Sequence, residues 1–248
     1  MRQPDECKKP DPGPAFCAFL RMKTMNKRLN AIAALVQDGI GLVDVGTDHG
    51  YLPALLAESG YSGALFASDI NAGPLSAAKR TAEEAGLTDR ICFLLCDGLH
   101  LCPPEEIDTI VIAGMGGDMI VRILDEAEWC MDPRYHLILQ PMTKAEVLRY
   151  WLVYNEFAIE SETITEDGGN LYQVISARFG GTTRLSDAEL FAGKRELCPY
   201  PELYERCLAR ILSRLENAVN GMNGREGEPR LQLYREILAQ LKELRGEK

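Results

Sequence analysis

The chain of 248 residues lacks the patterns that define several common classes of protein. It has no apolar run of the roughly 18 residues that a membrane-spanning helix needs, so no membrane association is expected. The three histidines, His49, His100 and His136, lack the spacing of metal ligands, and no metal is expected. Neither a Walker loop nor a G-x-S-x-G elbow is present. These absences disfavour membrane proteins, metal-dependent enzymes, P-loop nucleotidases and α/β-hydrolases.

The cysteines and the N-terminal sequence bear on where the protein resides. The eight cysteines include no C-x-x-C pair, which favours reduced thiols over disulfides. The apolar patch at residues 15–20 is too short for the core of a signal peptide. A cytoplasmic protein is therefore expected. Residues 1–21 combine proline and charge without periodicity, which predicts a disordered extension.

The formal net charge of −10 argues against broad, non-specific affinity for nucleic acid. A local basic segment nevertheless stands out, because four cations fall within eight residues that hold no acid: Arg21, Lys23, Lys27 and Arg28. This segment is either a solubilising end or a small face for an anionic partner, and the sequence leaves both interpretations open.

Short apolar runs and helical patterns alternate from residue 42 to residue 154, which is typical of parallel strands covered on both faces. The expected parallel strands are 42–45, 64–68, 91–95, 109–113 and 136–139. Two further extended runs, 158–166 and 171–179, are joined by a hairpin signal. Five parallel strands closed by a hairpin predict the seven-stranded, Rossmann-like α/β sheet of class I methyltransferases, over residues 22–181.

Residues 182–248 are expected to form a separate helical arm, after a hinge at 180–183. Helical patterns at 201–220 and 229–244 predict an antiparallel, coiled-coil-like pair. The outward cations of the first arm helix alternate with acids: Arg206, Arg210 and Arg214. A solvated face and a substrate-binding surface both remain possible for them.

The first strand ends in a glycine-bounded turn that opens a helix, a pattern typical of nucleotide sites. Asp44, Gly46, Asp48 and Gly50 follow the acid-x-Gly-x-Gly-x-Gly motif of methyltransferases that use S-adenosylmethionine (SAM), with Asp48 in place of the middle glycine. The same aspartate breaks the dinucleotide fingerprint, and with the terminal hairpin it disfavours a nicotinamide oxidoreductase.

Two more acids are expected beside this turn, since the carboxyl ends of parallel strands share one edge of the sheet. Asp69 ends the second strand, near the spacing at which an acid binds ribose hydroxyls. Asp97, followed by Gly98, ends the third strand and is placed to bind an adenine amino group. The glycine-rich end of the fourth strand, residues 113–117, allows close approach of a substrate or methyl donor.

Four motifs in this order resemble the bacterial tRNA adenine-N1 methyltransferases of the TrmK type: 44–53, 112–117, 137–141 and 166–168 with Tyr172. The resemblance covers about residues 22–246. It implies a Rossmann-like domain with a helical arm, SAM as cofactor, and methyl transfer to N1 of adenine 22 in tRNA. It also implies cofactor contacts by Asp48, His49, Tyr51, Leu52, Asp69, Asp97, Gly98, Ala113, Gly114 and Met115.

The resemblance places Arg28 on the tRNA side, and neighbouring Lys27 is the second candidate for a phosphate contact. Both precede the cofactor turn on a separate predicted helix, so we expect them not to affect SAM affinity. Gly114 and Met115 are assigned the positioning of substrate and methyl group. No general base is assigned, because N1 of neutral adenine has a lone pair and no proton. Tyr51, Met115 and Tyr172 are candidates for stacking on the target base.

Other functions stay open on sequence alone. The chain is also compatible with a SAM-dependent methyltransferase of a small molecule or protein, or with a non-catalytic protein that binds SAM or tRNA. A monomer is expected.

Overall fold

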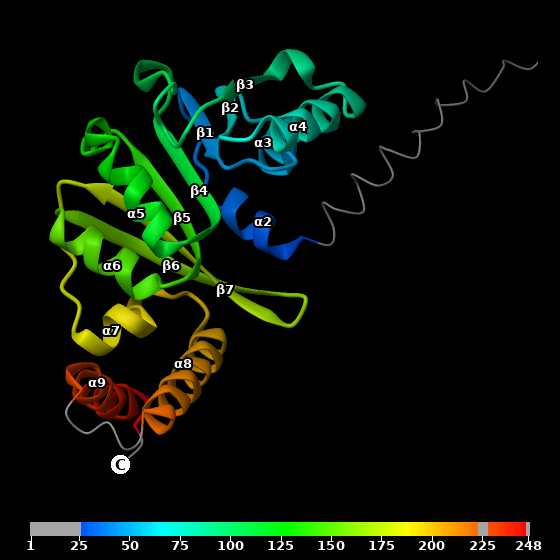
Figure 1. Ribbon diagram of the computed structural model, residues 1–248. Coiled ribbons are helices and arrows are strands. Elements are labelled where there is room, and N and C mark those ends of the chain that lie inside the picture. The colour runs from blue at the N-terminus through cyan, green and yellow to red at the C-terminus, as the bar shows by residue number, and fades with distance from the viewer. Residues whose placement is uncertain (1–25, 223–227, 247–248) are drawn as a thin grey trace, which may run out of the picture.

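A computed structural model describes residues 26–222 and 228–246, and these form a seven-stranded sheet in the order β3-β2-β1-β4-β5-β7-β6 (Figure 1). Strands β1 to β5 pair in parallel, and β7 and β6 are antiparallel, as the sequence predicts. The strands are β1 Gly41–Val45, β2 Ala64–Asp69, β3 Ile91–Leu95, β4 Thr109–Gly116, β5 His136–Thr143, β6 Phe157–Asp167 and β7 Asn170–Phe179.

Helices cover both faces of this sheet because neighbouring strand residues are apolar and point to opposite sides. The helices before the arm are α2 Lys27–Ala33, α3 Tyr51–Glu58, α4 Ala72–Glu84, α5 Gly117–Asp125 and α6 Ala145–Tyr154. In β1, Leu42 packs with residues of α2, α3 and α4, whereas Val43 packs with residues of α5 and α6. All five residues of β1 are buried, as expected for a central strand.

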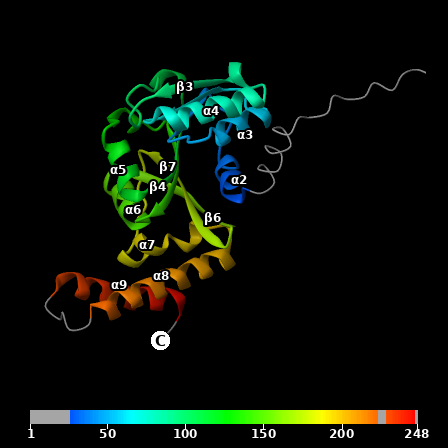
Figure 2. The ribbon, with the colours of Figure 1, turned by 45° about the vertical axis from the view of Figure 1, so that its right-hand side comes forward.

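The C-terminal helices pack on the β6–β7 edge of the sheet and on α6 (Figure 2). They are α7 Asp187–Ala192, α8 Pro201–Gly221 and α9 Pro229–Arg245. Helices α8 and α9 form the predicted pair, and their common core includes Ile164 of β6. The short helix α7 was not expected, although its capping box, Ser186 with Glu189, is a readable signal.

The segment 180–183, predicted as a hinge, is hydrogen-bonded to Ile159 of β6 and to Glu156 just before this strand. The amides of Gly180 and Gly181 donate to the carbonyl of Glu156, and the Ile159 amide donates to the Thr183 hydroxyl. The arm is thus joined to the sheet by a bonded connection and a shared core.

A buried ion pair also joins the arm to the sheet. Arg149 of α6 and Glu162 of β6 have side-chain exposures of 0% and 3%, and Nη2 donates to the carboxylate at 2.6 Å. Nη1 of Arg149 donates to the carbonyls of Leu190 and Phe191 in α7. One guanidinium therefore bridges α6, β6 and α7.

Strand β4 extends beyond its expected end at residue 113, and part of the N-terminal segment lies outside the described residues. Strand β4 continues to Gly116 through register shifts, and α5 ends at Asp125, before a separate turn at Glu128–Cys130. The extension predicted for 1–21 lies outside the described residues, as do Arg21 and Lys23. None of the described helices is long and apolar enough to cross a bilayer.

Candidate active site

The turn after β1 places three alternate residues in the left-handed region. The φ angles are +70° at Gly46, +52° at Asp48 and +68° at Gly50. Aspartate tolerates this region better than most residues, because its short polar side chain bonds locally. The backbone therefore explains how Asp48 can replace the middle glycine of the motif without changing the turn.

Two glycines of this turn also have close neighbours. A Cβ on Gly46 would overlap the methyl end of Met115, and one on Gly50 would lie 2.9 Å from Cβ of Ala78. The first glycine thus brings the turn against the end of β4. The second lets α3 begin next to α4.

Asp44, at the end of β1, is 6% exposed, and its Oδ2 accepts a hydrogen bond of 2.7 Å from the Thr47 hydroxyl. Burial raises the pKa of this carboxyl from 3.8 to about 7, against the lowering effects of Thr47 and Arg28. Nearby Asp69 adds a smaller raising effect. Asp44 is therefore a buried acid that can hold a proton near neutral pH.

Two adjoining hollows lie at this edge of the sheet. The larger, of about 490 Å³, is bordered by Asp69, Asp97, Gly98 and Met115. The smaller, of about 300 Å³, is bordered by Asp44, His49, Tyr51 and Leu52. Both share Gly46, Asp48, Ala113 and Gly114. The fold thus brings all twelve residues expected to bind the cofactor to one continuous site.

The strand-end acids differ in their existing partners. Asp69 is 8% exposed, and its Oδ1 accepts the Asn71 amide at 2.8 Å. No hydrogen bond to its Oδ2 from another described residue is present, so this oxygen can accept from a ligand. Asp97 instead accepts a bond of 2.8 Å from Nη2 of Arg122 in α5. Arg122 also borders the larger hollow, and sequence reasoning missed it because nothing local marks its partner.

Gln140, near the end of β5, organises the side of the site facing the arm. Its side chain is fully buried, and Oε1 accepts from Nη1 of Arg28 at 2.8 Å and from the Gly114 amide at 3.2 Å. The guanidinium of Arg28 lies 5.8 Å from the ring centroid of Tyr172. Sequence reasoning did not assign Gln140 a role, although it lies in one of the family-like motifs.

This network corrects one expectation about the basic helix. Helix α2 is separate from the turn, as predicted, but Arg28 borders the smaller hollow together with Asp48 and His49. The premise that Arg28 is remote from the cofactor site is therefore wrong. Lys27 is exposed on the same helix.

The three candidates for stacking on the target base lie at or near the two hollows. Tyr51 borders it and stacks on His49, with ring centroids 5.2 Å apart and an interplanar angle of 14°. Tyr172 contacts the site through Arg28, and Met115 borders the larger hollow. In the part of the chain that the structure describes, no group of three or more His, Cys, Asp or Glu residues could hold a metal ion.

Residues 25–175 match the family model described as a methyltransferase domain. The sequence is 36% identical over 156 residues to the tRNA (adenine(22)-N(1))-methyltransferase of Bacillus subtilis, covering 63% of this chain and 66% of that protein. The fold matches M. capricolum TrmK in complex with S-adenosyl-homocysteine with a TM-score of 0.73 and 27% identity, covering 90% of this chain and 96% of that one. The chain belongs to the TrmK family of methyltransferases.

This TrmK-family chain is also similar to Streptococcus pneumoniae Sp1610 in complex with S-adenosyl-L-methionine. The identity is 32% and the TM-score 0.73, over 86% of this chain and 99% of that one. SAM is therefore the cofactor, and the residues present fit it. The larger hollow has the size of a small-molecule site, with a glycine-lined wall and an acid whose Oδ2 can accept hydrogen bonds.

Proposed function

We propose that this protein transfers the methyl group of SAM to N1 of adenine 22 in tRNA. The observation that carries the proposal is the convergence of the Gly46–Gly50 turn, the acids of three strands and the Gly114–Met115 segment on one site in a TrmK-family fold. The B. subtilis relative is named for this reaction, and the matched methyltransferase domain, residues 25–175, contains the whole site.

The reaction needs alignment more than acid–base chemistry. Bound SAM supplies an electrophilic methyl group on a positively charged sulfur. N1 of adenine attacks with its own lone pair, so no residue has to remove a proton first. The task of Gly114 and Met115 is to let the base approach along the line of the methyl–sulfur bond and to exclude water. Positive charge moves to the base during transfer, and the carboxylate of Asp48, which borders the smaller hollow, favours that shift.

The proposed cofactor contacts divide along the site. Asp69 binds the ribose hydroxyls, and Asp97 with Gly98 binds the adenine ring. The turn residues Gly46, Asp48, His49, Tyr51 and Leu52 surround the amino-acid end, beside buried Asp44. Ala113, Gly114 and Met115 border the methyl group. Since Gln140 holds both Gly114 and Arg28, the target base would enter between β4 and α2.

Asp69→Ala tests the cofactor assignment. Loss of a carboxylate that accepts from ribose hydroxyls should cost roughly 1.5–3 kcal/mol, which corresponds to SAM binding at least about tenfold weaker. Calorimetry measures this affinity, and Asp89→Ala, an exposed acid away from the site, is the matched control. Equal affinities for the two variants would remove Asp69 from the binding site.

The substrate assignment is tested with the wild-type protein. Labelled SAM and unmodified tRNA should yield label at N1 of adenine 22, and a transcript with guanine at position 22 should accept none. Label at another base or in a small molecule would assign a different substrate. Binding of SAM without any transfer would indicate a non-catalytic protein.

The proposal extends to the tRNA partner and to the organisation of the chain. Lys27 and Arg28 of α2 lie on the side from which the base would enter, and they are proposed to contact tRNA. Residues 22–181 are proposed as the methyltransferase domain and 182–248 as an arm for tRNA. The protein is proposed to act as a cytoplasmic monomer, which sedimentation and fractionation would check.

A further inference from the structure

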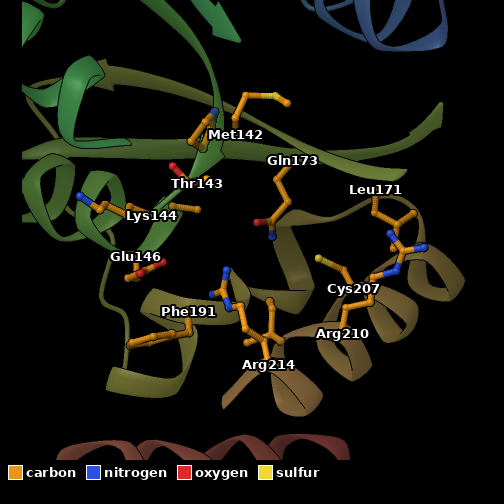
Figure 3. A pocket seen from close by; sticks show the side chains of 13 residues that line it. Met142, Thr143, Lys144, Glu146, Leu171, Gln173, Phe191, Cys207, Arg210 and Arg214 are labelled. Carbon is orange, nitrogen blue, oxygen red and sulfur yellow. The ribbon is translucent and has the colours of Figure 1, made fainter. Parts of the chain in front are cut away.

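A groove separate from the SAM site lies between the β5–α6 connection and helix α8 (Figure 3). Its volume is about 140 Å³. One wall comes from Met142, Thr143 and Lys144, and the opposite wall from Arg210 and Arg214 of α8. The methyltransferase domain and the arm therefore each contribute cations to one surface.

The three cations of the groove differ in how far they are already engaged. Lys144 Nζ binds a carboxylate oxygen of Asp118 at 2.8 Å, and Nη2 of Arg210 donates to the Gly169 carbonyl at 2.9 Å. Arg214 is exposed and has no hydrogen bond or ion pair with any residue that the structure describes. Its guanidinium extends from α8 into the groove (Figure 3). Glu146 contributes the one carboxylate among the lining residues.

Concentrated positive charge is unexpected in a chain whose net charge is −10. Arg206, the first arginine of α8, differs from Arg214 because it is paired with Glu166 through both of its terminal nitrogens. Of the three arginines along α8, Arg214 is thus the one that has neither a hydrogen bond nor an ion pair with a described residue. A guanidinium in this state suits a phosphate group, which its fork of donors can bind in two places.

Strand β5 links the groove to the site of methyl transfer. Gln140 binds the Gly114 backbone, and three residues later Thr143 lines the groove. Strands β4 and β5 still pair there, through register shifts, with Met115 opposite Pro141 and Gly116 opposite Thr143. Pro141, the residue after Gln140, already lines the groove, so the groove begins about 3.3 Å along the strand from Gln140. A nucleotide chain whose base is inserted beside Gly114 can reach it.

We propose that this groove binds the phosphodiester backbone of the RNA next to the target adenosine, with Arg214 as the main contact. The inference rests on the proposed tRNA substrate and deepens it. Arg210 and Lys144 shape the groove and add positive charge, while Glu146 opposes binding by repulsion. The groove thereby couples the arm to the placement of the base.

The test measures how tRNA affinity depends on salt for single variants of the full chain. Each phosphate contact contributes about 0.7–0.9 to the slope of log affinity against log salt. Arg214→Ala should lower the slope by about that amount and weaken tRNA binding several-fold at low salt. Arg214→Lys should keep most of the slope because it keeps the charge. Glu146→Gln should act in the opposite direction and strengthen binding.

Arg235→Ala is the matched control, because Arg235 is exposed on α9 and does not line the groove. SAM affinity and melting temperature should be the same in all these variants and in the wild type. A slope for Arg214→Ala equal to that of the control, or no gain from Glu146→Gln, would overturn the proposal. An unaltered tRNA response with a change in affinity for an acidic peptide would assign the groove to a protein partner.

The two proposals fail in different ways. If the wild type methylates adenine 22 but Arg214→Ala behaves as the control, only the groove assignment fails. If tRNA binds with a slope that depends on Arg214 but no methyl group is transferred, only the reaction fails. If the wild type does not bind tRNA, both fail.

Discussion

Replacing Gln140 by leucine tests whether a buried amide positions the methyl-transfer site. Gln140 is fully buried, and its Oε1 accepts from both the Gly114 amide and the Arg28 guanidinium. Leucine has a similar size but no polar atom, so the variant removes both bonds, and the donation from Nε2 to the Pro141 carbonyl at 3.0 Å, without creating a large cavity. The two elements joined at this point, β4 and α2, would lose their polar connection.

The magnitude follows from the lost hydrogen bonds of the Gln140 side chain. A neutral hydrogen bond contributes about 1 kcal/mol to stability, and a bond to a charged group about 1.5–3 kcal/mol. Gly114 and Arg28 both retain some access to water, which can replace part of the loss. We therefore expect the free energy of unfolding to fall by roughly 1–3 kcal/mol. The turnover number should fall by more than tenfold, because a shift of about 1 Å at a reacting centre can cost a hundredfold.

Urea denaturation measures the stability, and single-turnover methylation at saturating SAM and tRNA measures the rate. Gln140→Glu is the control, since a carboxylate keeps both acceptor contacts and binds Arg28 more strongly. Its rate should lie much closer to the wild type than that of the leucine variant. A leucine variant with normal kcat, or equal loss of kcat in both variants, would refute the positioning role of the acceptor oxygen.

Two further predictions concern buried ionisable groups. The pKa of Asp44 is raised to about 7 in the folded state, so the folded chain binds more protons than the unfolded chain between about pH 4 and 7, and stability falls as pH rises through this range. Asp44→Asn should flatten that dependence in denaturation curves, and an unchanged pH profile would contradict the raised pKa. Arg149→Met should lower stability by roughly 3–5 kcal/mol, because it leaves the Glu162 carboxylate buried without its partner. The double variant Arg149→Met/Glu162→Leu should be less destabilised than the single one, and additive losses would show that the two groups are not coupled.

The sheet could be predicted because its signals are local. Strand lengths, glycine turns and the change from single apolar runs to a hairpin are all readable within short windows of sequence. The hairpin turn illustrates this, since Gly168 and Gly169 have φ angles of +54° and +78°, as a tight two-residue turn demands. The short helix α7 was missed, although its capping box marks it.

The SAM site could be predicted for a related reason. Parallel strands with right-handed crossovers place their carboxyl ends on one edge, so Asp44, Asp69 and Asp97 had to converge once the strand order was known. The site residues that could not be predicted are the hydrogen-bond partners that other helices and strands supply. Arg122 of α5 pairs with Asp97, and Gln140 of β5 binds Arg28, which lies 112 positions away.

The sequence by itself determined the class of fold, the edge on which the cofactor binds and the residues at the ends of the strands. Tertiary structure alone decided that Arg28 belongs to the site, that 180–183 is bonded to β6, and that Arg214 faces a groove shared with Lys144. The physical reason is the range of the interactions. Periodicity and turn geometry act over a few residues, whereas these contacts depend on how distant helices pack against the sheet, and no local pattern encodes that packing.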